Sequence, residues 1–69
     1  MEKGSISKII RDRHFGFIHL DDSDPGAQDV FFHGSACSDF RSLQEGDHLE
    51  FEIEQTDRGM LAKNVKKIS

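Results

Sequence analysis

Aromatic and imidazole rings are concentrated in two short segments of this chain. Residues 13–20 read Arg-His-Phe-Gly-Phe-Ile-His-Leu, and residues 29–33 read Asp-Val-Phe-Phe-His. Flat rings stack on unpaired bases, and a nearby arginine pairs with phosphate. These residue types indicate binding to a single-stranded nucleic acid, a function that needs no bond-making chemistry.

Both segments have the composition of β-strands, in which side chains alternate between the two faces. The aliphatic residues of both strands then share one face with Phe32, and they fill the inward positions. Phenylalanine is more often buried than exposed, but here the inward positions are already taken. A soluble chain rarely exposes an aromatic patch without a ligand for it. The outward face carries Phe15, Phe17, His19, Phe31 and His33.

The remaining elements are also short and extended. Strands are predicted over 4–10, 15–20, 29–33, 48–54 and 60–68, and a polar Asp-rich loop over 21–28. Residues 34–39 have room for a single helical turn, and no helix of ordinary length is indicated. Five short strands bury their inward side chains best by closing into one small barrel.

The first strand does not follow the alternation well, and Lys8 is the residue that shows this. Strict alternation would place its unpaired charge in the core beside Ile6, so a bulge or bend is predicted near Lys8. The predicted core consists of Ile6, Ile18, Leu20, Val30, Phe32, Leu49, Phe51, Ile53 and Val65.

Length and composition predict a single domain over residues 1–69, near the lower limit for folding alone. No segment has the pattern of a signal peptide or a membrane span. Cys37 is the only cysteine, so no internal disulfide can form; we expect a reducing, cytoplasmic setting and a small buried thiol.

The net charge of −4 is unevenly distributed along the chain. Residues 1–20 carry +2, residues 21–57 carry −10, and residues 58–69 carry +4. Such a surface can hold phosphates locally, although its long-range attraction for them is weak.

Several other functions are disfavoured by the residue pattern. His33 and Cys37 are four residues apart, but no second ligand pair accompanies them, so no metal site is expected. His14 and His48 are interpreted as solvated surface residues. The chain has no nucleophile near a base and no phosphate-binding loop, so we expect neither an enzyme nor a cofactor nor a small-molecule substrate. A monomer is expected.

Two motifs and the second half of the chain resemble the cold-shock domain family. The resemblance runs from about Gly4 to Val65 and rests on Arg13-x-Phe15-Gly16-Phe17-Ile18, Asp29-Val30-Phe31-Phe32-His33-x-Ser35-Ala36, Leu43-x-Glu45-Gly46-Asp47-x-Leu49-x-Phe51-Glu52-Ile53, Arg58-Gly59 and Ala62-x-Asn64-Val65. It implies an all-β fold, a five-stranded antiparallel barrel of the oligonucleotide-binding (OB) type. It also implies binding of single-stranded RNA or DNA on the face of the first three strands.

The resemblance also implies roles for individual residues. Phe15, Phe17, Phe31 and His33 match base-stacking positions, and Phe40 resembles a loop aromatic that contacts bases, although it could instead cap the barrel's end. Arg13 and Arg58 match basic positions. With Lys8 and His19, the candidate nucleic-acid-binding set is Lys8, Arg13, Phe15, Phe17, His19, Phe31, His33, Phe40 and Arg58.

Departures from the family pattern fall mainly around the same face. Lys8 replaces the usual stacking tryptophan, His14 replaces a glycine, and Gly34 replaces a further aromatic residue. The loop over 21–28 is about four residues longer than in typical small bacterial members. Losing two or three stacking positions would cost several kcal/mol, at ~1–3 kcal/mol per base.

Two functions therefore remain as hypotheses. The first is a single-strand binder of low sequence specificity, acting as an RNA chaperone or as a regulator of transcription or translation. The alternative is an OB-type protein-interaction module that has weakened or lost nucleic-acid binding.

Overall fold

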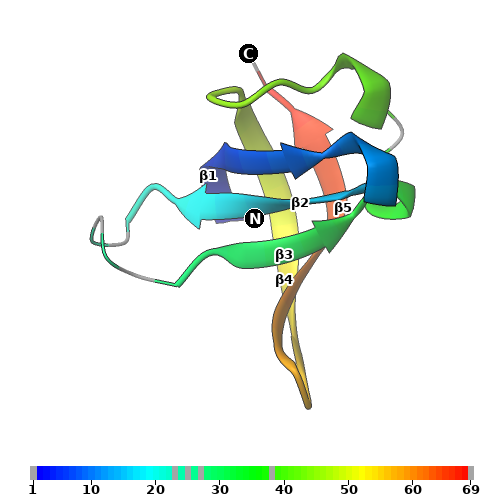
Figure 1. Cartoon of the computed structure of the whole chain (residues 1–69). Helices are drawn as coiled ribbons and strands as arrows, with labels where there is room; N and C mark the ends of the chain where they lie inside the picture. The colour runs from blue at the N-terminus through cyan, green and yellow to red at the C-terminus, as the bar shows by residue number, and fades with distance from the viewer. Residues whose placement is uncertain (1, 23, 25, 27, 38, 69) are drawn as a thin grey trace.

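Five strands and three single 3₁₀ turns make up the chain in a computed structural model, which describes residues 2–22, 24, 26, 28–37 and 39–68 (Figure 1). The strands are β1 (Glu2–Ile10), β2 (Phe15–Leu20), β3 (Val30–His33), β4 (His48–Thr56) and β5 (Gly59–Lys67), and the 3₁₀ turns are η1 (Arg11–Arg13), η2 (Gly34–Ala36) and η3 (Phe40–Ser42). All five predicted strands are present, and no end differs by more than two residues from its predicted position. No helix in the described part of the chain is long and apolar enough to cross a membrane.

The strands close into a barrel, as predicted, and their order around it is β1-β2-β3-β5-β4. Four of the pairings are antiparallel, but β3 and β5 run parallel, with Phe31 opposite Leu61. The expectation of a wholly antiparallel barrel is therefore corrected in this one respect. The reason is geometric: a closed ring with an odd number of strands cannot alternate in direction at every step.

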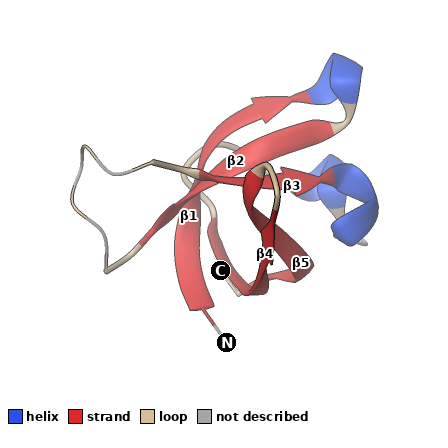
Figure 2. Ribbon diagram, turned by 90° about the horizontal axis from the view of Figure 1, so that it is seen from below, coloured by secondary structure: helices blue, strands red, loops and turns tan. Residues whose placement is uncertain are grey.

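The helical turns gather at one end of the β1–β2–β3 sheet (Figure 2). Here η1 connects β1 to β2, and η2 and η3 follow β3. The connection from β2 to β3 leaves from the opposite end, and the β4–β5 hairpin projects beyond the barrel (Figure 1). This arrangement brings 3₁₀ turns from distant parts of the sequence together beside the start of β2 and the end of β3.

The core is made by the inward side chains of all five strands. Seven of the nine predicted core residues are buried, whereas Leu20 and Ile53 are partly buried at its margin. Cys37 is buried as expected, and burial raises the pKa of its thiol, which keeps it protonated at neutral pH. The buried apolar residues are Ile6, Ile18, Val30, Phe32, Cys37, Phe40, Leu43, Leu49, Phe51, Ala62 and Val65.

The predicted irregularity in the first strand is confirmed. The pairing register of β1 with β2 shifts between Ile6 and Lys8, so that Ile6 points into the core while Lys8 is exposed. The extra residue in β1 reverses the alternation beyond it. Lys8 thereby comes to lie opposite Phe17 of β2.

Candidate nucleic-acid interface

Three phenylalanines, Phe15, Phe17 and Phe31, form a cluster on the outer surface of β2 and β3. Phe17 lies directly opposite Phe31 in the antiparallel register, and all three side chains are partly exposed. Their ring centroids are 5.3 to 5.9 Å apart, and each ring is tilted or perpendicular to its neighbours. These three residues are called the phenylalanine cluster below. Alternation along two paired strands places them together, as the sequence predicts.

His33 extends this surface at one end, because it lies opposite Phe15 in the β2–β3 register and is exposed. Its Nδ1 accepts a hydrogen bond from the Ser35 backbone N–H at 3.1 Å, and the Ser35 hydroxyl lies 2.9 Å from the same nitrogen. The neutral ring therefore carries its proton on Nε2. That N–H is a donor available to a ligand.

Two cations border the phenylalanine cluster from the β1 side. Lys8 is exposed opposite Phe17, and residues directly opposite on paired strands present their side chains to the same face. Arg13 is exposed at the end of η1, two residues before Phe15. Arg11, by contrast, donates hydrogen bonds to the backbone carbonyls of Arg41 and Leu43, so its guanidinium is engaged at the end of the barrel.

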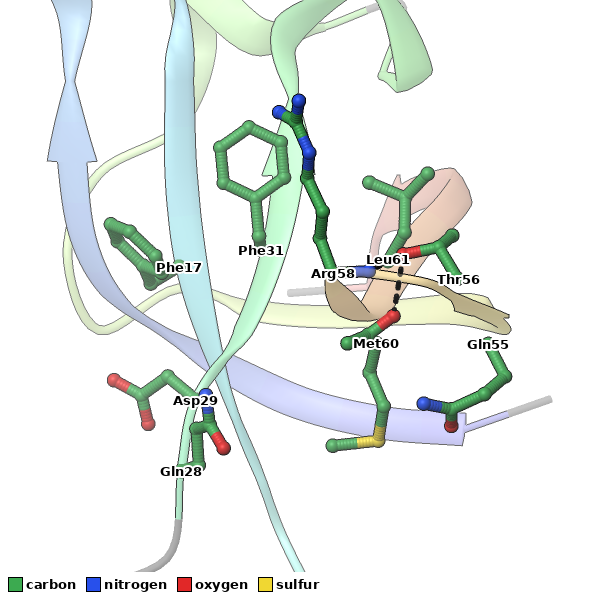
Figure 3. Close-up of a pocket in the computed structure, with 10 residues that line it drawn as sticks. Phe17, Gln28, Asp29, Phe31, Gln55, Thr56, Arg58, Met60 and Leu61 are labelled. Atoms are coloured by element: carbon green, nitrogen blue, oxygen red, sulfur yellow. Dashed lines mark hydrogen bonds between the residues drawn. The ribbon is translucent and has the colours of Figure 1, made fainter.

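Residues of the β4–β5 hairpin form a second wall, called the hairpin wall below, that faces the phenylalanine cluster. A cavity of about 690 Å³ lies between it and the phenylalanine cluster, lined on one side by Phe17 and Phe31 and on the other by Arg58, Met60 and Leu61 (Figure 3). Arg58 belongs to the candidate set predicted from the sequence, whereas Met60 and Leu61 do not. The signal in the sequence that could have pointed to them is that two adjacent apolar residues directly follow a turn.

Hydrogen bonds within the hairpin turn hold Arg58 in place. The Thr56 hydroxyl donates to the Gly59 carbonyl at 2.7 Å, and the Arg58 backbone N–H donates to Thr56 Oγ1 at 3.2 Å. Gly59 has a φ of 118°, in a region that favours glycine, so the turn requires this residue type. The side chain of Arg58 is exposed and lines the cavity together with Phe31 (Figure 3).

His19 lies on the predicted face but is engaged by an acid. Its Nδ1–H donates to Oδ1 of Asp29 at 3.2 Å, and both side chains are about 30% exposed. The pair joins the end of β2 to the residue before β3. The negative charge of Asp29 disfavours a phosphate nearby. His19 is therefore better placed to join the end of β2 to the start of β3 than to bind the phosphate backbone of a nucleic acid.

Phe40 is not on this face, which corrects its expected role as an exposed contact to bases. It is only 5% exposed in the core, and its ring lies 6.1 Å from that of Phe32. The single turn η3 points the ring inward, so Phe40 caps the barrel. The ring of His14 covers it from outside, with the centroids 4.5 Å apart.

Three acidic residues of β4 lie away from the phenylalanine cluster, whereas Asp29 lines the cavity together with Phe17 and Phe31. Glu50, Glu52 and Glu54 are on β4, which pairs with β1 and β5 and is separated from β2 and β3 in the barrel order. Lys66 is in register opposite Glu50, and Lys63 opposite Glu52. Positive charges of the C-terminal strand therefore lie in register beside the acidic strand β4, whereas Lys8, Arg13 and Arg58 are the exposed cations that we place beside the phenylalanine cluster.

Comparisons with known proteins agree with this geometry. The model of the 'Cold-shock' DNA-binding domain matches residues 2–68. The chain is 43% identical to the major cold shock protein CspA of Bacillus anthracis over 67 residues, which are 94% of each chain. It is 39% identical to the cold shock protein CspA of Staphylococcus aureus over 70 residues, covering 99% of this chain and 100% of that one.

A solved structure, drosophila Unr CSD456, superimposes on 99% of this chain with a TM-score of 0.78 and 22% identity. This chain covers 26% of that longer one. At this level of identity the similarity shows the fold alone.

Proposed function

The chain belongs to the cold-shock domain family, and on that premise we propose that it binds single-stranded RNA or DNA with little sequence preference. The observation that carries the proposal is the phenylalanine cluster, three mutually contacting and partly exposed rings on β2 and β3. Every base has a π-face, so stacking on such rings contributes ~1–3 kcal/mol per base with little discrimination between bases.

Unpaired bases reach this face, whereas the bases of a duplex are already stacked on their neighbours. The phenylalanine cluster and the hairpin wall are open enough to accept a strand between them, with Phe31 on one side and Arg58 on the other. The exposed cations Lys8, Arg13 and Arg58 supply phosphate contacts along the strand, and His33 supplies an N–H donor. We therefore expect binding of single strands and not of duplex DNA.

We further propose that the protein acts in the cytoplasm as an RNA chaperone or as a regulator of transcription or translation. A protein that binds only the open form of a hairpin shifts the hairpin equilibrium toward that form by mass action. No catalytic step is needed for this effect. Its size depends on protein concentration relative to the dissociation constant, so a weak binder needs to be abundant.

A protein-interaction role is the second candidate. The observations that favour it are the net charge of −4 and the lysine at position 8, which offers no flat ring. The apolar part of the hairpin wall, Met60 and Leu61, could receive a side chain from another protein as well as a base. Nucleic-acid titrations separate the two candidates.

The proposal is tested by fluorescence anisotropy with labelled oligo-dT, a mixed-sequence RNA and a DNA duplex. Phe17→Ala and Phe31→Ala should each weaken single-strand binding by ~1–3 kcal/mol, because each removes one stacking ring. Ile68→Ala is the matched control, since Ile68 is 49% exposed beyond the end of β5 and away from the phenylalanine cluster.

Thermal unfolding of each variant shows whether it keeps the fold. Wild-type protein that binds none of the single strands would contradict the proposal and favour the protein-interaction role. Binding that both phenylalanine variants retain in full would instead show that the ligand contacts another surface.

A further inference from the structure

His14 is held in an unusual place beside the phenylalanine cluster and His33. It follows η1 with a φ of 61°, in the left-handed region that a residue with a side chain adopts only at a cost in free energy. Its backbone carbonyl accepts a hydrogen bond from the N–H of Gly34 at 2.7 Å. This bond ties the start of β2 to η2, so the position of His14 is fixed by the fold.

The ring of His14 packs on two neighbours and remains exposed. Its centroid lies 4.5 Å from that of Phe40, which is buried beneath it, and 5.6 Å from that of His33. The His14 and His33 rings meet edge to face, with an interplanar angle of 69°. The surface of β2 and β3 thus continues beyond His33 by one further ring.

Gly34 provides the space for this ring. A Cβ atom built at Gly34 would lie 2.3 Å from one ring carbon of His14 and 2.4 Å from Nε2. Any residue other than glycine at this position would displace the imidazole. The bare backbone of Gly34 and the face of Phe40 therefore form a seat for the His14 ring.

We propose that His14 is a further base-contacting residue, whose ring stacks on the nucleotide next to the one held at His33. The inference rests on the proposed function and adds to it a stacking position at the end of the sheet. Phe40, which the sequence suggested as a base contact, acts here as the buried support of His14. The imidazole supplies a flat surface, preorganised by Phe40 and Gly34, at the place where a strand leaving His33 passes.

Three variants test this role by anisotropy titration with oligo-dT and mixed RNA, in the presence of EDTA to remove metal ions. His14→Asn removes the ring but suits the left-handed backbone, and it should weaken binding about 5-fold or more, since a stacked base contributes at least that factor. His14→Phe keeps a flat ring and should bind within about 2-fold of wild type. His48→Asn, on an exposed histidine of β4, is the matched control and should have no effect.

Gly34→Ala tests the seat itself. The added Cβ should push the His14 ring away and weaken binding about as much as His14→Asn does. In the His14→Asn background the same change should have little further effect, because no ring remains to be displaced. Such non-additivity in a double-mutant cycle distinguishes a displaced ring from a general loss of structure.

His14→Gly provides a second ringless variant, in which the backbone strain is also removed, and melting curves identify any variant that is not folded. The inference is overturned if folded His14→Asn or His14→Gly binds as tightly as wild type while Phe17→Ala binds more weakly. The proposed function itself fails, by contrast, if wild-type protein and all variants bind no single strand.

Discussion

Lys8 is the residue whose chemistry departs most from the pattern that the chain otherwise follows on this face. It is exposed opposite Phe17, at the position where the family resemblance places a stacking tryptophan. A lysine offers a flexible point charge to a phosphate and no flat surface to a base.

Replacement of Lys8 by tryptophan should therefore tighten binding to oligo-dT by ~1–3 kcal/mol, the contribution of one stacked base. The magnitude of the log–log salt slope should decrease by about 0.7, since one phosphate contact is lost. Anisotropy titrations at two or more salt concentrations measure both effects. Lys8→Gln separates them, because it removes the charge and adds no ring.

A folded Lys8→Trp protein that binds no better than wild type would contradict this prediction. It would mean that β1 no longer contributes to the binding surface. The protein-interaction role would then gain weight.

Among the elements, β2 depends on a glycine between two residues of the phenylalanine cluster. A Cβ atom at Gly16 would lie 2.8 Å from the backbone carbonyl oxygen of Lys8 and 2.8 Å from the ring of Phe32. The close approach of β1 and the core leaves no room for a side chain.

We expect Gly16→Ala to lower the free energy of unfolding by ~1–3 kcal/mol, as overpacking of a core does. Urea titration followed by circular dichroism measures the change. Gly26→Ala is the control, since nothing in the described part of the chain lies within 4 Å of a Cβ atom there, and it should change stability by less than ~0.5 kcal/mol. Equal stabilities of the two variants would show that β1 and β2 are less closely packed than the structure indicates.

The β4–β5 hairpin positions Arg58 across the cavity from Phe31. Arg58→Ala should weaken single-strand binding and decrease the magnitude of the salt slope by about 0.7, because one phosphate contact is removed. Lys66→Ala is the matched control, since Lys66 faces Glu50 on the acidic side of the barrel. If both variants gave the same slope as wild type, the hairpin would not contact the strand's backbone.

At the scale of the whole molecule, the distribution of charge limits how strongly salt affects binding. Lys8, Arg13 and Arg58 are the three exposed cations that we place beside the phenylalanine cluster, while Nζ of Lys67 lies 3.5 Å from Oδ2 of Asp47. With about 0.7 per phosphate contact, the log–log salt slope for a single strand should be about −2. Titrations between ~50 and ~200 mM salt test this value, and a slope as steep as about −6 would reveal a second basic surface.

Much of the architecture follows from the sequence because it depends on local patterns. Alternation with a period of two places Phe17 and Phe31 outward and Ile18 and Val30 inward, whatever the rest of the chain does. The same rule predicts a bulge or bend near Lys8, since an unpaired charge does not remain in a small core, and the register shift lies between Ile6 and Lys8. The five strands and the closed barrel are predicted on this basis, whereas the family is predicted from the resemblance of the sequence motifs.

The tertiary structure decides what depends on contacts between distant segments. Phe40 is in the core because η3 turns it inward, and no local pattern distinguishes that from an exposed loop residue. The seat of His14 requires Gly34, twenty residues further along the chain, to lie beneath it. Likewise, only the β4–β5 register places Lys63 and Lys66 against glutamates and away from the phenylalanine cluster. The physical reason is that alternation fixes which face of a strand a side chain occupies, whereas barrel closure determines which residues share that face.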